Sequence, residues 1–425
     1  MRALGLDIGL SGVRATIVDD AGGLLATASA GDPATIAHGR ASHDPRLWRS
    51  AAFSAARAAL DRAGPVDVIG IGALGSAPFL VDADGEPVGE ALLFSLDSRS
   101  EADRAELGLT GDHALPKVRW LAARNPRGIR ATDACGWIVE QLTGRPTMDA
   151  ITRLAWTPEI DLPLPIPDPV DPLSHAPLTT DQLGLPRGTP VVAGTFDSYV
   201  DVYAAGCRAP GDGCVLLGST LVVYGVVADE IEVAGLELQA YPGDGYLLGG
   251  ATSSGGNVIA WARRTFGDEI ASGPIADGLR VLPYLAGERT PVRDAAATGA
   301  VLGITLTTTP AELHRAFVDG IALAALDHAE RIATAVTVGR WRVSGGGVRN
   351  ASWLAATADA LGVPLEVAPL AGEGAGPALF ALAAMGVDPP PGRASLIEPD
   401  AAATSWYRDA LAPYRARHPH LRGAP

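Results

Sequence analysis

Short apolar runs separated by glycine-containing turns dominate the start of the chain. The run over residues 1–9 ends in Gly9, and the runs over 13–19 and 24–28 flank the turn Asp20-Ala21-Gly22-Gly23. Apolar runs of this length between turn residues are typical of short buried strands. The pattern therefore predicts three consecutive strands joined by tight turns.

A helix is predicted next, because its start and its stop are both encoded locally. Asp44 offers a capping carboxylate directly before Pro45, and proline is favoured at the first helical position. Gly64 ends the helix at about residue 63. The expected apolar face comprises Leu47, Trp48, Ala51, Ala52, Ala55 and Ala59. Further strands are predicted over residues 66–72 and 79–81.

The same order of elements recurs from residue 213 onward. Strands are predicted over residues 213–217, 221–227 and 246–249, followed by a helix at about 257–265. The remaining expected elements are a long helix over 310–335, a strand over 341–344, a helix over 352–361, a strand over 365–367 and a helix over 375–385. This is a duplicated architecture without the fixed period of a solenoid or propeller.

Two α/β lobes with a cleft between them are the fold expected from this duplication. We place the boundary near Gly206-Cys207, which gives an N-terminal lobe of residues 1–206 and a C-terminal lobe of residues 207–425. Residues 158–190 are rich in proline and are predicted to form an irregular connector on the first lobe. Ligands bind preferentially in crevices between such lobes.

Charge and cysteine content narrow the range of partners and compartments. The formal net charge is −15, and no basic stretch is present, which weighs against nucleic acid or an anionic membrane as main partner. Cys135, Cys207 and Cys214 form an odd set without metal-ligand spacing, so a reduced, cytoplasmic chain is expected. Neither a signal peptide nor an uninterrupted apolar stretch of about 20 residues is seen.

Two strand ends carry carboxylates suited to phosphate chemistry. Asp7 stands directly before the Gly9 turn, where a carboxylate beside freed backbone amides suits a hydrated Mg²⁺ on a nucleotide phosphate. Asp197 follows the apolar run Val191-Val192 and could act as a general base. The structural alternatives are a strand-ending aspartate in a turn for Asp7 and a helix N-cap for Asp197.

Two clusters of small residues in the second half could approach a nucleotide. Gly218-Ser219-Thr220 offers hydroxyl groups and closely spaced backbone amides for phosphate oxygens. Gly345-Gly346-Gly347 follows a predicted strand and leads to a helix near Asn350, although the chain has no P-loop. An ordinary hairpin turn and a flexible strand–helix turn are the alternatives.

A third group of polar residues lies in the first half. Asp97 and Arg99 would share one face of a strand and could bracket a ligand with several hydroxyl groups. A surface ion pair is the commoner meaning of such spacing.

In chain order, these segments resemble those of the FGGY family of carbohydrate kinases. The matching segments are Gly5 to Arg14, Leu80-Val81-Asp82 with Gly85-Glu86-Pro87, Asp97-Ser98-Arg99, Lys117-Val118-Arg119-Trp120-Leu121, Leu142-Thr143-Gly144, Gly188 to Gly194 with Asp197, Pro283-Tyr284-Leu285 with Gly287 to Pro291, Gly299 to Gly303, and Gly345-Gly346-Gly347 with Asn350. The resemblance implies two ribonuclease-H-like lobes of the actin and hexokinase type.

The resemblance also implies ATP-dependent phosphorylation of a sugar hydroxyl, with ATP and Mg²⁺ as cofactors. By this likeness Asp197 would be the general base and would also contact the sugar, and Asp7 would hold Mg²⁺. The residues implied around the phosphates are Gly9, Ser11, Arg14, Gly218, Ser219 and Thr220, with Gly346, Gly347 and Asn350 at the adenosine and Ser76, Asp97 and Arg99 on the sugar side.

Departures from the family pattern keep alternatives open. Leu10 stands where the family usually has a hydroxyl residue, and Leu74-Gly75-Ser76-Ala77 replaces the Gln-Met-His-Gly stretch of xylulokinases. A five- or six-carbon sugar, with a pentulose such as xylulose as first choice, is the expected substrate. The alternatives are an actin- or chaperone-like ATPase module and a sugar-binding kinase homologue without turnover. A homodimer is compatible with the sequence.

Overall fold

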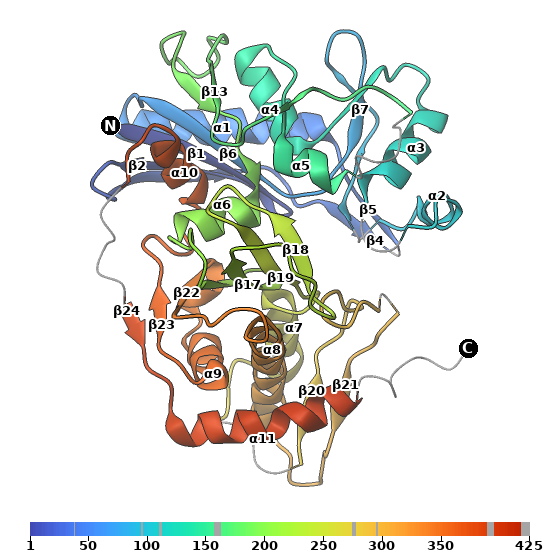
Figure 1. Cartoon of the computed structure of the whole chain (residues 1–425), viewed down its shortest axis with the longest axis vertical. Coiled ribbons are helices and arrows are strands. Elements are labelled where there is room, and N and C mark those ends of the chain that lie inside the picture. Colours follow the sequence, from blue (N-terminus) through green and yellow to red (C-terminus); the bar gives the residue numbers. More distant parts are fainter. Residues whose placement is uncertain are drawn as a thin grey trace. The chain divides into compact units, whose positions relative to one another are not determined.

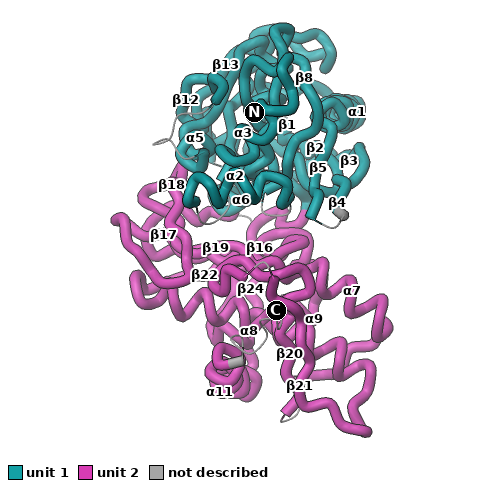
Figure 2. Tube along the Cα trace, turned by 90° about the vertical axis from the view of Figure 1, so that its right-hand side faces the viewer, with its two compact units in different colours: residues 1–204, 373–392 teal, residues 205–372, 393–425 magenta. Residues whose placement is uncertain are grey.

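The computed structural model describes residues 1–37, 39–94, 97–109, 113–156, 163–273, 278–294, 296–388 and 395–417. The chain divides into two compact units, shown in Figure 2: Met1–Ala204 with Glu373–Gly392 forms unit 1, and Ala205–Gly372 with Arg393–Pro425 forms unit 2. The first change of unit lies close to the expected boundary at residues 206/207. Residues 373–392 differ from that expectation, because they pack in unit 1 and not with their neighbours in sequence.

The main sheet of unit 1 begins with the predicted strands. β1 (Arg2–Gly9), β2 (Gly12–Asp19) and β3 (Leu24–Ala30) form an antiparallel meander, and β6 (Val68–Ala73) pairs parallel to β1. β14 (Pro190–Val192) and β15 (Thr195–Phe196) both pair parallel to β6. The carboxyl ends of β1, β6 and β15 therefore lie at one edge of the sheet.

Helix α1 (Pro45–Ala63) begins and ends where its capping residues predict. The Asp44 carboxylate accepts a hydrogen bond from the Arg46 amide, and Gly64 closes the helix with a φ of 82°. Leu47 is 45% exposed, so its assignment to the apolar face is wrong. The helix turns its Trp48 side toward the sheet, and Phe53 is buried in addition to the expected alanines.

The proline-rich stretch is more regular than expected. β12 (Pro169–Val170) pairs with β11 (Met148–Asp149), and β13 (His175–Pro177) extends the main sheet beside β14. Proline is tolerated in such short edge strands. Residues 157–162 of this stretch lie outside the described residues. The other elements of unit 1 are β4 (Thr35–Ala37), β5 (Arg40–His43), β7 (Phe79–Val81), β8 (Pro87–Val88), β9 (Ala91–Leu92), β10 (Arg130–Thr132), α2 (Glu101–Glu106), α3 (Ala114–Arg124), α4 (Ala134–Thr143), α5 (Ala150–Ala155) and α6 (Asp197–Ala204).

Helix α10 (Gly376–Ala384) returns from near the end of the chain to complete unit 1. It packs on β1 and β6, and Figure 1 shows it beside β1 and β2. Two glycines of the sheet allow this close approach. A Cβ on Gly5 would lie 2.4 Å from the Ala378 nitrogen, and one on Gly70 would lie 2.0 Å from the Pro377 carbonyl oxygen.

Unit 2 repeats the strand arrangement of unit 1. β16 (Asp212–Leu217) pairs antiparallel with β17 (Leu221–Val227) and parallel with β22 (Arg340–Ser344). The sheet order is β18-β19-β17-β16-β22-β23-β24. β18 (Glu237–Ala240), an edge strand with four half-buried residues, was not predicted because it has no apolar run. The remaining strands are β19 (Tyr246–Ala251), β20 (Arg280–Leu282), β21 (Ala300–Leu302), β23 (Leu365–Val367) and β24 (Ser395–Ile397).

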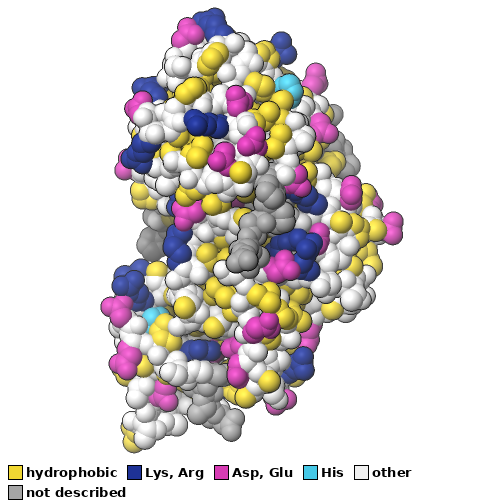
Figure 3. Space-filling model, turned by 90° about the vertical axis from the view of Figure 1, so that its left-hand side faces the viewer, with side chains coloured by type: hydrophobic (Ala, Val, Ile, Leu, Met, Phe, Trp, Pro, Cys, Tyr) yellow, Lys and Arg dark blue, Asp and Glu magenta, His cyan; other side chains and the backbone are white. Residues whose placement is uncertain are grey.

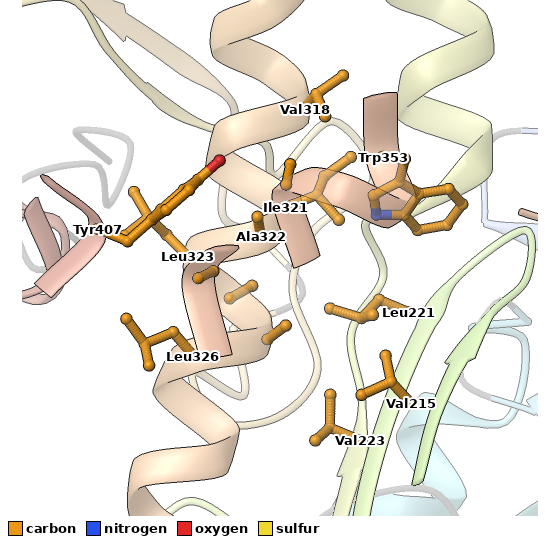
Figure 4. Packing of buried hydrophobic residues seen from close by; sticks show 14 of the residues in the cluster. Val215, Leu221, Val223, Val318, Ile321, Ala322, Leu323, Leu326, Trp353 and Tyr407 are labelled. Carbon is orange, nitrogen blue, oxygen red and sulfur yellow. The ribbon is translucent and has the colours of Figure 1, made fainter. Parts of the chain in front are cut away.

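A long central helix organises the core of unit 2. α8 (Pro310–Ile332) begins with a capping box between Thr309 and Glu312 and packs against α7 (Gly256–Phe266) and α9 (Ala351–Leu361). Figure 4 shows its apolar side chains among those of β16, β17, α9 and α11 (Ala401–Arg417). All three cysteines, Cys135, Cys207 and Cys214, are buried and none forms a disulfide.

Two surface properties bear on partners. No helix within the described residues is long and apolar enough to cross a membrane. On the face shown in Figure 3, arginine and lysine side chains are interspersed with aspartate and glutamate side chains.

Candidate active site

The sheet of unit 1 brings together three segments that the sequence singles out. Asp7 of β1 and Thr195 of β15 both pair with Gly72 of β6. β6 therefore lies between β1 and β15, and its carboxyl end leads to Ser76. Asp7, Ser76 and the residue after β15, Asp197, thus follow neighbouring parallel strands, where ligands of α/β sheets commonly bind.

The pKa of Asp7 is shifted by burial and by two charged neighbours, Asp197 and Arg14. Burial and the nearby Asp197 carboxylate raise the pKa of Asp7 to about 7, and Arg14 acts in the opposite direction. Arg14 stands directly across from Asp7 on β2, so both side chains share one face of the sheet. A Cβ on Gly374 would lie 3.2 Å from the Asp7 carboxylate and 2.7 Å from the Arg14 Cδ atom. The turn that precedes α10 therefore closes against this pair.

Asp197 is the first residue of α6, so the helical alternative for this position is also realised. Its carboxylate accepts a hydrogen bond of 2.6 Å from the Ser198 amide. The side chain thus combines a position at a helix start with a place beside Asp7.

Asp201 is a residue of this cluster that the sequence reasoning missed. It lies one helical turn after Asp197 on α6, and its carboxylate occupies the space where residue 376 would carry a side chain: a Cβ on Gly376 would lie 2.0 Å from it. Burial, Asp7 and Asp197 raise the pKa of Asp201 well above its usual range. The spacing of four residues from Asp197 was the available signal, since it places both side chains on one helical face.

Ser76, expected on the sugar side, lies in a buried loop of unit 1. The Ser76 carbonyl accepts a hydrogen bond of 2.8 Å from the Phe94 amide, which joins this loop to the segment leading to Asp97. The Ser76 hydroxyl is buried and has no hydrogen-bond partner among the described residues. The space beside Gly75 is filled, because a Cβ there would lie 1.8 Å from the Phe196 ring.

Asp97 and Arg99 form an ion pair that is largely buried. They do not lie in a strand, and the Asp97 side chain is fully buried. Its carboxylate accepts hydrogen bonds from the Ala41 amide at 2.9 Å and from Arg99 at 2.7 to 3.1 Å. Asp97 therefore holds Arg99 in place, and the 15% exposed guanidinium is the part of the pair that can meet a ligand.

Unit 2 brings the two small-residue clusters together at the ends of adjacent parallel strands. Residues 218–220 follow β16 and residues 345–347 follow β22. Gly345 has a φ of 89°, and a Cβ there would lie 2.7 Å from the Leu217 carbonyl oxygen. Asn350 caps α9 by accepting a hydrogen bond of 3.1 Å from the Trp353 amide. Ser219 and Gly346 are the exposed residues of the two loops, so a ligand could reach the backbone there.

Two segments that lie beside these small-residue clusters were not predicted from the sequence. The start of α7 packs against residues 218–220, with the Gly256 and Asn257 amides each donating a hydrogen bond of 3.0 Å to the carbonyls of Gly218 and Ser219. Arg349 donates a hydrogen bond of 2.8 Å to the Gly372 carbonyl and lies between the glycine cluster and Asn350. Ser-Gly-Gly-Asn over residues 254–257 was the overlooked sequence signal.

The residues present fit a magnesium nucleotide. Mg²⁺ prefers carboxylate, water and phosphate oxygens, and it is usually held by one or two protein carboxylates. The carboxyl groups of Asp7, Asp197 and Asp201 outnumber the one guanidinium of Arg14, and a bound cation would favour their ionised form. Within the described residues, no group of three or more His, Cys, Asp or Glu side chains is arranged to hold a metal ion. Asp7 would therefore share the ion with water and phosphate oxygens.

Comparison with known proteins finds similarity to carbohydrate kinases. Residues 213–385 match the C-terminal domain of the FGGY family of carbohydrate kinases. A glycerol kinase from Gloeobacter violaceus is 27% identical over 417 residues, covering 85% of this chain and 84% of that protein. A xylulose kinase from Staphylococcus xylosus is 26% identical, covering 84% of this chain and 85% of that protein. Residues 213–385 of this chain are therefore similar to the C-terminal domain of FGGY carbohydrate kinases.

Solved structures agree with the fold of an FGGY kinase. Xylulose kinase from Rhodospirillum rubrum superposes with a TM-score of 0.81 at 24% identity, covering 99% of this chain and 100% of that one. Gluconate kinase from Lactobacillus acidophilus gives 0.86 at 20% identity, covering 100% of this chain and 98% of that one. These likenesses confirm the expected α/β fold of the actin and hexokinase type. The match of residues 213–385 to a carbohydrate kinase domain favours a kinase over an actin- or chaperone-like ATPase module.

Proposed function

We propose that this FGGY kinase transfers the γ-phosphoryl group of ATP to a hydroxyl of a five- or six-carbon sugar, with a pentulose such as xylulose as first candidate. The observation that carries the proposal is the convergence of Asp7, Asp197 and the Ser76 loop after three neighbouring parallel strands of unit 1. MgATP supplies the phosphoryl group and the cation that neutralises its charge.

Asp197 is the proposed general base. Its carboxylate accepts the proton of the attacking sugar hydroxyl as that oxygen bonds to the γ-phosphorus and ADP leaves. Asp7 would orient the cation, and Arg14 would limit repulsion between the carboxylates and the phosphates. Asp201 lies beside both carboxylates, and burial with these neighbours raises its pKa and so favours its protonated form.

The nucleotide would lie along the backbone clusters of unit 2. Residues 218–220 would surround the phosphates with amide and hydroxyl donors, and Gly346, Gly347 and Asn350 would lie beside the adenosine. Gly9 and Ser11 would contribute the first phosphate turn. Leu10 packs partly against the apolar core of unit 1, so its side chain supplies no phosphate contact there.

On the sugar side, Ser76 and Arg99 are the proposed ligand contacts. The buried Ser76 hydroxyl lacks a partner among the described residues, and a buried polar group of this kind is stabilised by a ligand hydroxyl. Asp97 acts through Arg99, because its own acceptors are occupied. The relatives include both xylulose and glycerol kinases, so the substrate within the family is a matter for experiment.

A coupled ADP-release assay over ketoses, aldoses, polyols and sugar acids tests the proposal. We expect the highest kcat/KM for a ketopentose, and a value for glycerol well below it. A higher kcat/KM for glycerol would overturn the substrate assignment. Absence of ADP release with every sugar would overturn the kinase activity and favour a sugar-binding homologue without turnover.

A further inference from the structure

The segment from Gly287 to Pro291, one of those that resemble FGGY kinases, carries a buried acid in unit 2. Glu288 is 3% exposed, and no step of the proposed phosphoryl transfer uses it. Its neighbour Arg289 donates a hydrogen bond of 2.6 Å to the Thr252 carbonyl. The segment therefore lies beside the residues that connect β19 to α7.

Three hydrogen-bonding groups converge on the Glu288 carboxyl group. Its Oε1 atom accepts hydrogen bonds from the Ser253 amide and, at 2.8 Å, from the Arg289 amide. Its Oε2 atom lies 3.0 Å from the Ser254 hydroxyl, which also lies 2.7 Å from the Pro283 carbonyl oxygen. A hydroxyl has one proton to donate, so both contacts of Ser254 hold at once when Oε2 carries a proton and donates to Ser254. Burial raises the pKa of Glu288 to about 7, in agreement with this arrangement.

The residues that connect β19 to α7 support the turn at residues 218–220, and we call residues 252–257 the brace. The Ser254 carbonyl accepts a hydrogen bond of 3.0 Å from the Leu221 amide, and the Leu221 carbonyl accepts one of 2.8 Å from the Thr252 amide. Two further amides of the brace donate to carbonyls of the turn, as described for the start of α7. Backbone hydrogen bonds thus connect the brace to the turn along its whole length.

Close packing couples the brace to the turn as firmly as these hydrogen bonds do. A Cβ on Gly255 would lie 2.5 Å from the Thr220 carbonyl carbon, and one on Gly256 would lie 2.7 Å from the Gly218 carbonyl oxygen. The two backbones therefore touch without side chains between them. Packing at this density transmits a displacement from one segment to the next.

We propose that Glu288 is a positioning residue for the turn at residues 218–220 and acts through the brace. One oxygen of its carboxyl group holds two backbone amides, and the other holds the Ser254 hydroxyl. The consequence for nucleotide binding rests on the proposed function, in which this turn surrounds the phosphates of ATP, whereas the positioning itself does not. Loss of the contact should therefore impair the binding of MgATP and not that of the sugar.

Glu288→Ala tests the brace, because it removes all three contacts of the carboxyl group. We expect the Kd for MgATP, measured by calorimetry on the full chain, to rise at least about 10-fold, since buried donors are left unpaired. The KM for the sugar should stay within about twofold of the wild-type value. Without ligand, amide hydrogen exchange of residues 218–221 should become at least about threefold faster.

Glu288→Gln is the conservative variant and should restore both properties. Its carbonyl oxygen accepts from the two backbone amides as Oε1 does, and its NH₂ group donates to Ser254 as protonated Oε2 does. A glutamine variant as impaired as Glu288→Ala would overturn the proposal, because the three hydrogen bonds would then not be what positions the turn.

Ser254→Ala provides the second test where Glu288→Ala does not fold, since it removes only one hydroxyl. Exchange at residues 218–221 should become at least about twofold faster in this variant. Tyr407→Phe is the matched control, because it removes another buried hydroxyl of unit 2, which donates to Asp319. Figure 4 shows Tyr407 well apart from Leu221. We expect wild-type exchange at residues 218–221 and wild-type MgATP affinity for the control.

The exchange measurement needs no ligand, so it separates failure of the brace from failure of the proposed function. A wild-type protein that binds no MgATP would indicate that the proposed function fails. Exchange at residues 218–221 that is no faster in Ser254→Ala than in Tyr407→Phe would overturn the positioning role of Glu288.

Discussion

Unit 1 brings together three carboxyl groups, those of Asp7 on β1 and of Asp197 and Asp201 on α6. Arg14 lowers the pKa of both Asp7 and Asp201, yet burial and mutual repulsion raise them further. A folded protein retains such an arrangement at a cost, and perturbed carboxylates of this kind are concentrated at functional sites. A bound cation would favour the ionised form of these carboxyl groups.

Asp7→Ala should weaken MgATP binding at least about 10-fold, because the variant removes the carboxylate proposed to orient the cation. Calorimetry of MgATP against the nucleotide-free protein measures the effect. Asp84→Ala, in an exposed turn of the same unit, is the control and should bind as the wild type does. Unchanged affinity and unchanged turnover in Asp7→Ala would remove Asp7 from the site.

Ser76→Trp should raise the KM for the sugar at least about 10-fold and leave MgATP binding unchanged. The indole would fill the space reached by the buried hydroxyl of Ser76. Ser76→Ala is the milder companion, since it removes only the hydroxyl. If neither variant changes the sugar KM, Ser76 has only a packing role.

The chemistry of single residues was predictable only where sequence neighbours carry the signal. Asp7 and Asp197 follow apolar strands, and the clusters at residues 218–220 and 345–347 are small-residue turns. Asp201 follows no apolar strand, so its spacing of four residues from Asp197 was its only local signal. Its contact with Gly376 comes from a distant part of the chain. The sequence also does not reveal that the Asp97 carboxylate is already occupied by hydrogen bonds from the Ala41 amide and from Arg99.

At the scale of elements, helix ends were predicted well because their determinants are local. Asp44, Pro45 and Gly64 define α1 within a few residues of sequence. The edge strand β18 and the strands of the proline-rich stretch depend on partners elsewhere in the sheet. The membership of α10 in unit 1 likewise depends on glycines of β1 and β6, which only the packed structure reveals.

Gly70→Ala should destabilise unit 1 by about 2 kcal/mol or more, because its Cβ would lie 2.0 Å from the Pro377 carbonyl oxygen and 2.8 Å from the Ala381 Cβ atom. Denaturant unfolding measures the change. Gly339→Ala is the matched control, as no heavy atom lies within 4 Å of its added methyl group. Equal stability of the two variants would contradict the close packing of α10.

At the scale of the whole molecule, both units bury carboxyl groups in the same way. Burial raises the pKa of Asp133 in unit 1 and of Glu288 in unit 2 to about 7. Since these values exceed the ordinary ones, folding favours the protonated groups. Their contribution to stability is fully present below about pH 4 and is lost as pH rises through about 7.

Asp133→Asn should therefore stabilise the protein at pH 8 and have little effect near pH 4. Asparagine keeps the cap of α4 and carries no charge, so the gain at pH 8 should reach as much as about 4 kcal/mol. Denaturant unfolding of both proteins between pH 4 and pH 8 gives the difference. The exposed Asp61→Asn is the control and should show a constant difference. A difference for Asp133→Asn that does not grow with pH would contradict the buried, raised pKa.

The duplicated α/β architecture was predictable from the order of strands and turns, and the matching strand pairings of the two main sheets confirm it. The assignment of residues 373–392 to unit 1 was not predictable, because the sequence order indicates two consecutive lobes and this segment returns to the first. Sequence order predicts which strands exist, whereas the return of a distant helix onto the first sheet depends on tertiary packing.

The rate of ADP release by Asp197→Asn tests the central claim most directly. Asparagine keeps the shape of the side chain but cannot take the proton of the sugar hydroxyl. With the best sugar of the panel, the account predicts a fall in kcat of about 10²- to 10⁴-fold, with MgATP affinity by calorimetry near that of the wild type. A fall of less than about 10-fold would contradict the assignment of Asp197 as the general base.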